Sequence, residues 1–315
     1  MSIVKVEKQG MMTTVQDKGR RGYQQYGITE SGVMDPWALR WANLLAGNPD
    51  SAAGIEVTLM GPQLLFSEDT TIAVGGADLT AQLDGTEIPL WTSIPVKAGQ
   101  RLHFGKPRQG VRAYIAIHGG IDTPLVLGSR STYIKAKLGG FRGRELRNGD
   151  ELPVGPQTMK STRRKRLHQA LLPDYDISVP IRVLPGPDTG MFPETALQTF
   201  FSKEYALTNE VDRMGYRLDG PPLSLTQEGK MISDAVAMGT IQIPASGYPL
   251  LLLADRQTSG GYARIGSVIH ADLSKTAQLG PGKKVRFTET TLEEAHDLLK
   301  RKENRFQHFK KMHQL

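Results

Sequence analysis

Residues 70–90 read TTIAVGGADLTAQLDGTEIPL, and three short stretches of this segment have the character of strands. These stretches are residues 70–74, 79–83 and 86–90. Asp84-Gly85 joins the last two, and such a pair is typical of a type I′ hairpin turn, in which both central residues have positive φ. The segment therefore predicts antiparallel strands connected by tight turns.

The same pattern continues along the chain. Residues 101–104, 111–117 and 151–154 predict further strands, and the apolar run 249–254 predicts a central strand. This regular spacing, with little helix between, predicts a barrel or sandwich core. Residues 98–104 and 281–287 both show a glycine turn that leads into an alternating strand. With a basic, proline-bounded stretch at residues 160–180, this weak repeat favours two similar β domains.

Two helices have clear terminal signals. Asp35 is a good N-cap, Pro36 suits the first helical position, and Gly47 suits the position just past the end. A second helix is predicted from Thr291, where Thr291-x-x-Glu294 forms a capping box. Residues 291–315 are therefore expected to form a C-terminal helix and a basic tail, after a first domain at 1–160 and a second at 175–290.

Composition narrows the class of protein. The chain has 315 residues, a formal charge of +7, and no cysteine, which excludes disulfides and thiolate chemistry. Much of the charge lies in residues 160–166 and 300–311, without the aromatic residues or motifs of nucleic-acid modules, so we interpret both as solvated segments. The apolar runs are too short for a membrane span, and no secretory signal is visible. We expect a cytoplasmic protein that binds neither nucleic acid nor membrane.

Several common chemistries lack their motifs. The sequence contains no P-loop, no dinucleotide-binding glycine fingerprint and no Gly-x-Ser-x-Gly elbow. Its seven histidines have no helix-face metal spacing, so no metal site is predicted. No cofactor is expected in this chain.

Candidate binding residues in the first half pair charges with glycines. Asp17 and Arg20 lie in a glycine-containing loop before the first helix. Either they hold a small ligand or they form a structural pair that braces the loop. Arg40 and Asn43 lie on a helix flank that the tryptophan face need not bury, so they are candidates for substrate binding. Residues 128–133, rich in Gly, Ser and Thr, either hold an anion or rigidify a loop.

The second half has a similar mix. Arg213 and Arg217 are close in sequence, and Asp255-Arg256-Gln257-Thr258 resembles the first Asp–Arg motif in character. Forked guanidinium donors, carboxylate acceptors and glycines together suit a flat ligand rich in hydrogen-bonding groups. The remaining candidates for this pocket either contact the ligand or serve as ordinary turn and strand residues: Asp234, Gln242 and Tyr262.

The motifs also resemble a known family. Thr-Val-Gln-Asp-x-Gly-Arg, Ser-Gly-x-Met-Asp, Gly-Ser-x-Ser-Thr, Asp-Arg-x-Gly-Tyr-Arg-Leu and Asp-Arg-Gln-Thr-x-Gly-Gly-Tyr occur in this order. So ordered, they resemble the allophanate hydrolase subunit 2 family, which includes KipA, the C subunit of 5-oxoprolinase (PxpC) and the urea carboxylase carboxyltransferase domain. The resemblance covers residues 3–287.

The resemblance implies a mainly β fold with two cyclophilin-like β-barrel domains and a few short helices. It implies a subunit of an ATP-dependent 5-oxoprolinase, which opens 5-oxo-L-proline to L-glutamate with a subunit 1 (PxpB/KipI-like) protein and a PxpA-like protein. ATP would bind a partner. Two alternatives stay open, namely a KipA-like regulator that antagonises a KipI-type histidine kinase inhibitor, and a carboxyltransferase subunit of a biotin-dependent urea carboxylase-like system.

The resemblance also implies roles for the motif residues. Arginine would bind a lactam or ureido carbonyl oxygen, and aspartate would accept from the ring N–H. We expect catalytic roles for Asp17, Arg20, Arg213 and Asp255, with an arginine stabilising a developing oxyanion. Replacing Arg20 or Asp255 with alanine is expected to abolish turnover and to change stability by only about 1–2 kcal/mol. The expected substrate-binding residues are Arg40, Asn43, Arg217, Asp234, Gln242, Gln257, Thr258 and Tyr262.

Overall fold

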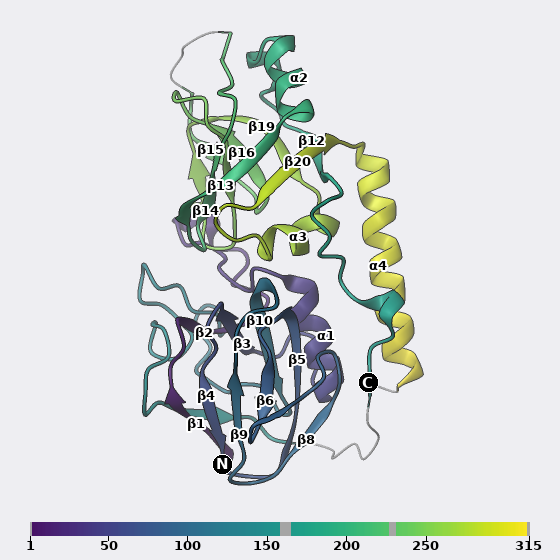
Figure 1. Cartoon of the computed structure of the whole chain (residues 1–315). Coiled ribbons are helices and arrows are strands. Elements are labelled where there is room, and N and C mark those ends of the chain that lie inside the picture. Colours follow the sequence, from purple (N-terminus) through teal and green to yellow (C-terminus); the bar gives the residue numbers. More distant parts are fainter. Residues whose placement is uncertain (1, 158–164, 227–230, 314–315) are drawn as a thin grey trace. The chain divides into compact units, whose positions relative to one another are not determined.

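The chain folds into two compact units, shown in Figure 1. A computed structural model describes residues 2–157, 165–226 and 231–313. Unit 1 comprises Met1–Arg21, Ser31–Pro173 and Arg305–Leu315, and unit 2 comprises Gly22–Glu30 and Asp174–Asn304. The short segment Gly22–Glu30 thus groups with the second half of the chain, and the end of the C-terminal helix groups with the first.

Unit 1 is built from two antiparallel sheets (Figure 1). The first has the order β11-β1-β4-β9-β6-β7, and the second has the order β2-β3-β10-β5-β8. Apolar residues from alternate positions of both sheets form one core, which includes Val6, Leu64, Leu102, Ile72 and Ile115. The strands are β1 Ser2–Lys8, β2 Met12–Gln16, β3 Gly54–Thr58, β4 Gln63–Phe66, β5 Thr70–Asp78, β6 Ala81–Leu83, β7 Thr86–Glu87, β8 Ile94–Val96, β9 Arg101–Phe104, β10 Gln109–Ile117 and β11 Glu151–Val154.

The hairpin predicted at Asp84-Gly85 is confirmed. Both residues have positive φ, 47° and 82°, and Leu83 pairs with Thr86 across the turn. The strand before the turn begins later than expected, at Ala81, because Thr80 has a φ of 51° and its N–H donates to the Asp78 carboxylate at 2.9 Å.

The first helix, α1 (Pro36–Ala46), has the predicted ends. The Asp35 carboxylate accepts from Ala38 N at 3.1 Å, and Gly47 takes the left-handed conformation just past the last helical residue. Trp37 and Trp41 are buried on the helix face that was expected to pack. Local sequence signals therefore determine both ends of this helix.

Unit 2 contains a closed seven-stranded barrel with the order β12-β19-β16-β17-β14-β13-β20. A parallel pairing of β12 with β20 closes it, and the other neighbours are antiparallel. The strands are β12 Ile181–Pro185, β13 Glu204–Val211, β14 Gly215–Asp219, β16 Thr240–Ile243, β17 Leu250–Leu252, β19 Ala263–Val268 and β20 Lys284–Glu289.

Short elements complete unit 2. The helix α2 (Glu194–Ser202) stacks Phe200 on Phe287 of β20, with ring centroids 4.9 Å apart. A two-stranded sheet pairs β15 (Asp234–Ala235) with β18 (Ser259–Gly260). The other short helical elements of unit 2 are η1 Gln24–Tyr26, η3 Thr189–Met191, η4 His270–Asp272 and α3 Leu273–Ala277. Unit 1 has the 3₁₀ turn η2 Gln169–Leu171.

The fold class was predicted correctly in its broad form. The protein is mainly β, and unit 2 forms a closed barrel. The described residues of unit 1 do not form the second barrel that was expected. They form two separate sheets that share one hydrophobic core. The weak repeat is present in the structure, since Gly99 and Gly282 both have positive φ and precede β9 and β20.

The C-terminal helix α4 (Leu292–Met312) corrects the interpretation of the basic tail. Its capping box is confirmed, because Thr291 Oγ1 accepts from Glu294 N and a Glu294 oxygen accepts from Thr291 N. The helix continues past Lys300 to Met312, and Phe306 and Phe309 are buried against Trp41 at centroid distances of 4.7 and 5.4 Å. The last turns of α4 therefore pack into unit 1.

This packing predicts the effect of Phe306→Ala on stability. The ring is fully buried and contacts two tryptophans edge-on, so we expect unit 1 to lose about 3–5 kcal/mol of unfolding free energy. The three tryptophans all lie in unit 1, so urea denaturation followed by tryptophan fluorescence reports on this unit. Leu292→Ala, at an exposed position of the same helix, should change the midpoint little. Equal effects of the two substitutions would show that the end of the helix does not pack on unit 1.

Candidate functional site

A buried ion pair joins two loops of unit 2. Arg213 lies in the turn between β13 and β14, and Asp255 follows β17. Arg213 Nε donates to Asp255 Oδ2 at 3.0 Å, and Arg213 Nη2 donates to Oδ1 at 3.1 Å. Asp255 N also donates to the Arg213 carbonyl at 2.8 Å. Both side chains are at least nine-tenths buried, so each gives the other a partner of opposite charge away from water.

Beside this pair, unit 2 has a pocket of about 350 Å³. Two predicted binding residues line it, Arg217 from β14 and Gln257 from the loop after β17. The Arg217 guanidinium is paired with Glu210 Oε2 at 2.7 Å, and both side chains are well exposed. The other lining residues combine polar and apolar groups: Asn209, Glu210, Val211, Asp212, Met214, Gly215, Leu250 and Leu252.

The side chain of Gln242 is hydrogen-bonded to that of Gln257. Gln242 is fully buried in β16, and its Oε1 accepts from Gln257 Nε2 at 3.4 Å, while its own Nε2 donates to the Tyr262 carbonyl at 3.3 Å. Gly260 lies directly on this amide, since a Cβ there would be 2.5 Å from Gln242 Nε2. Gln257 is therefore oriented by Gln242 of β16, which is in turn held by the segment that contains Gly260 and Tyr262.

The other predicted residues of unit 2 are not among those that line the pocket. Asp234 is exposed and pairs with Arg264 Nη1 at 2.8 Å, and this hydrogen bond lowers the pKa of Asp234. Arg264 also binds Asp188 at 2.7 Å. Thr258 accepts a backbone hydrogen bond from Val236, and the Tyr262 side chain is half exposed. Asp234 thus belongs to a separate charge cluster.

In unit 1, Asp17 binds the loop that contains Ser129 and Ser131. Its Oδ1 accepts from Ser129 Oγ at 2.6 Å, from Ser131 Oγ at 2.5 Å and from Gly19 N at 2.8 Å. Its Oδ2 accepts from Arg130 N at 2.6 Å. These contacts support a bracing role for Asp17, and the partners that they give it are Gly19 and residues 129–131. They also explain the hydroxyls of the Gly-Ser-x-Ser-Thr motif.

Arg20 is bound to the same loop. Its side chain is fully buried, and Nη2 donates to the Ser131 carbonyl at 2.5 Å. Gly139 admits the guanidinium, because a Cβ at that residue would lie 2.4 Å from Nη2. The small stability change expected for alanine at Arg20 or Asp255 assumed an exposed side chain. Both residues are buried, so this assumption is wrong. Their replacement must therefore cost more than about 1–2 kcal/mol.

Arg40 and Asn43 have structural partners within unit 1. The Arg40 guanidinium lies over Trp37 and Phe306, 4.6 and 4.1 Å from their ring centroids, and Nε pairs with Asp50 at 3.2 Å. Asn43 is fully buried, contrary to the expectation for its helix flank. It donates to Ala52 O at 2.8 Å and accepts from Asn48 Nδ2 at 3.1 Å. Arg40 and Asn43 therefore hold α1 in place.

A buried polar network at the start of α1 was not predicted. Glu56 of β3 accepts from Met34 N at 2.8 Å, and the Tyr114 hydroxyl accepts from Asp35 N at 2.8 Å. Burial raises the pKa of Tyr114 well above its usual value, and the nearby Glu56 and Asp35 carboxylates raise it further. The available signal was Glu56 itself, a carboxylate between the apolar residues Ile55 and Val57.

The structure also gives a partner to Arg256, which lies inside a motif but was not predicted as a site residue. Its Nη2 binds Glu30 at 2.8 Å, its Nε donates to Val236 O at 3.0 Å, and its carbonyl accepts from Thr29 Oγ1 at 2.7 Å. The bonds to Glu30 and Thr29 fasten the segment Gly22–Glu30 to the rest of unit 2. The described residues contain no group of three or more histidines and carboxylates able to hold a metal ion, and within them no helix is both long and apolar enough to cross a membrane.

The buried pair predicts strong coupling between Arg213 and Asp255. Either single alanine substitution removes the oppositely charged partner of a buried side chain, so we expect each to lower the unfolding free energy of unit 2 by about 3–5 kcal/mol. The double substitution removes both charges and should cost less than the sum of the two. Urea denaturation followed by circular dichroism completes this double-mutant cycle. Additive costs would show that the two side chains do not compensate each other.

Comparison with known proteins gives the family. Residues 26–289 match the carboxyltransferase domain, subdomains A and B. The chain is 39% identical to the C subunit of 5-oxoprolinase from Escherichia coli (98% of this chain, 97% of that protein) and 37% identical to its counterpart from Haemophilus influenzae (92% of each).

Larger proteins match over part of their length. The urea amidolyase of Saccharomyces cerevisiae is 33% identical over 94% of this chain but only 17% of its own length. The crystal structure of the Kluyveromyces lactis urea amidolyase superposes with a TM-score of 0.91 at 31% identity, over 98% of this chain and 20% of that one. The resemblance seen in the motifs is confirmed, and this chain belongs to the carboxyltransferase-domain family that includes the PxpC subunit of 5-oxoprolinase and the corresponding region of urea amidolyase.

Proposed function

We propose that this chain is the PxpC subunit of an ATP-dependent 5-oxoprolinase that converts 5-oxo-L-proline to L-glutamate. The proposal rests on the share of each relative's length that the match covers. The two 5-oxoprolinase relatives match over 92–97% of their length, whereas the urea amidolyases match over 17% of theirs. The likeness to PxpC therefore extends to a whole protein, while the likeness to urea amidolyase concerns one region of a longer chain.

The partners follow from this assignment. A protein of the PxpC type implies further subunits, which we take to be a subunit 1 (PxpB/KipI-like) protein and a PxpA-like protein. The sequence lacks a P-loop, so ATP is assigned to a partner. On its own, this chain is expected to be inactive.

We assign lactam recognition to the pocket of unit 2. The Gln257 amide offers an N–H donor and a carbonyl acceptor side by side, which matches the C=O and N–H on one edge of a lactam. The Arg217 guanidinium can bind the substrate carboxylate with two parallel hydrogen bonds once it exchanges Glu210 for the ligand. The charge of the substrate and its amide edge are thus both matched by lining residues.

Arg213 and Asp255 then act as positioning residues. Their side chains are bonded to each other. The bond links the turn that contains Asp212 and Met214 to the segment that contains Gln257. Their proposed effect on the reaction is to fix the pocket walls. Asp17 and Arg20 position the loop around Ser129 and Ser131 in the same way. Stabilisation of an oxyanion by Arg20 or Arg213 stays a prediction.

Carboxyl transfer is a second candidate, because the matching family is described as a carboxyltransferase domain and a putative urea carboxylase of Emericella nidulans is 33% identical over 93% of this chain. In that case a biotinylated carrier protein would supply the carboxyl group. Regulation of the KipA kind would instead show as tight binding to the subunit 1 partner without turnover.

Reconstitution tests the function. The purified chain is mixed with its subunit 1-type and PxpA-type partners, ATP and 5-oxo-L-proline, and glutamate is measured with each component omitted in turn. We expect glutamate only from the complete mixture. Undiminished glutamate without this chain would refute the proposal, as would an inactive complete mixture with tight binding to subunit 1. A carboxylated product that requires a biotinylated carrier would establish the second candidate instead.

Arg217→Gln tests the pocket in the same assay. Loss of a charged hydrogen-bonding partner costs about 1.5–3 kcal/mol, so kcat/KM should fall about tenfold to a hundredfold. Arg286→Gln is the matched control, because Arg286 is similarly exposed on the barrel of unit 2 and also faces a glutamate, Glu204, at 3.9 Å. An Arg217 variant with the kcat/KM of the control would place substrate recognition elsewhere.

A further inference from the structure

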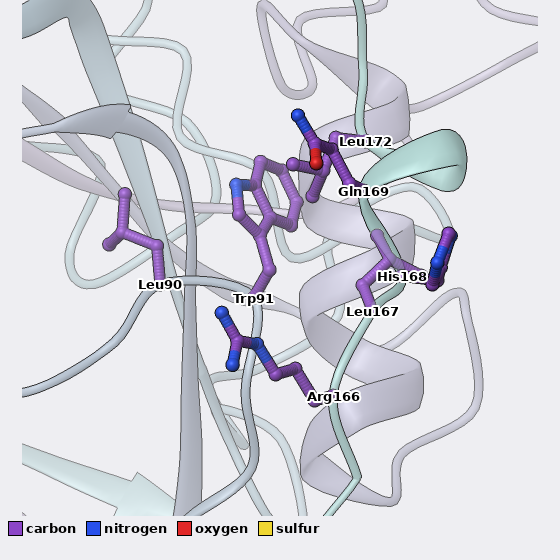
Figure 2. A pocket seen from close by; sticks show the side chains of 7 residues that line it. All are labelled: Leu90, Trp91, Arg166, Leu167, His168, Gln169 and Leu172. Carbon is purple, nitrogen blue, oxygen red and sulfur yellow. The ribbon is translucent and has the colours of Figure 1, made fainter.

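Unit 1 has a cavity that the proposed reaction does not use. It has a volume of about 540 Å³, which is within the range of small-molecule sites. Figure 2 shows the seven lining residues, Leu90, Trp91, Arg166, Leu167, His168, Gln169 and Leu172. Three leucines and a tryptophan give it apolar walls, and none of its residues lines the pocket of unit 2.

Trp91 is held rigidly in this wall. Its backbone N–H donates to Val74 O at 2.8 Å, and its backbone carbonyl accepts from Leu167 N at 2.9 Å. Its φ is 57°, a strained value for a bulky residue. The indole lies against the bare backbone of Gly75, where a Cβ would be 2.6 Å from the ring. Such rigidity lowers the cost of ordering the wall when a ligand binds.

The cavity has one permanently charged side chain among its lining residues, the Arg166 guanidinium. No carboxylate is among the lining residues. Within the part of the chain that the structure describes, the Arg166 guanidinium makes no ion pair and no side-chain hydrogen bond. In Figure 2 the guanidinium is seen on one side of the Trp91 indole and the Gln169 amide on the other, while the His168 ring points away.

We propose that this cavity binds a small monoanion with a flat apolar body, namely an aromatic carboxylate. The carboxylate would pair with the Arg166 fork, and the ring would replace water against Trp91, Leu167 and Leu172. One guanidinium matches one carboxylate, so a neutral ring or a multiply charged nucleotide is a poorer fit. The Gln169 amide can donate to a second oxygen of the ligand.

Isothermal titration calorimetry of the full chain with 2-naphthoate tests this proposal, and 2-naphthamide serves as the neutral isostere. We expect one site per chain, with a dissociation constant in the millimolar range or tighter. The amide should bind about tenfold more weakly or worse, since it lacks the charge. Arg166→Gln should weaken naphthoate binding by a similar factor, and Leu172→Glu should abolish it by placing a like charge in the wall.

Arg147→Gln is the control, because Arg147 is also an exposed arginine of unit 1 but lies outside the cavity, and it should bind naphthoate like the wild type. Arg166 and Leu172 are exposed, so their variants should keep the circular dichroism spectrum of the native protein. Three results would each overturn the proposal: no saturable binding up to about 10 mM, equal affinity for the acid and the amide, or unchanged affinity in the Arg166 variant.

Discussion

Burial of charge is the constraint on which unit 2 depends. A guanidinium and a carboxylate removed from water must satisfy each other, and Arg213 and Asp255 do so with two hydrogen bonds. Because one residue lies in the β13–β14 turn and the other follows β17, their bond ties these two loops together. The pocket lined by Arg217 and Gln257 is formed by the same loops, so its shape is set by a pair that need not touch the ligand.

The same physics changes the interpretation of the Asp–Arg motif in unit 1. Asp17 accepts four hydrogen bonds and Arg20 binds the Ser131 carbonyl, so both side chains are occupied by their own fold. The expectation that guanidinium and carboxylate groups converge directly on a flat ligand is replaced by a division of labour. Buried charged side chains build the loops, and we propose that neighbouring half-exposed side chains such as Gln257 meet the ligand.

How much the sequence predicts depends on the range of the interaction. The Asp84-Gly85 turn, the caps of α1 and the capping box of α4 rest on residues a few positions apart, and all three are predicted correctly. Closure of the barrel and the partner of Asp17, more than a hundred residues away, depend on tertiary packing that no local pattern reports. The basic segment at the end of α4 is interpreted from its charges as a solvated tail, but Phe306 in that segment is buried against Trp41 of α1, a contact between residues far apart in the sequence.

The central claim is that the substrate binds beside the Arg213–Asp255 pair, and hydrogen–deuterium exchange of the assembled complex tests it most directly. With saturating 5-oxo-L-proline, the backbone amides of residues 209–215 and of Gln257 should exchange more slowly than without ligand, because the pocket walls become ordered. Unchanged exchange in these segments, with protection confined to residues 129–131 or to the partner subunits, would contradict this account.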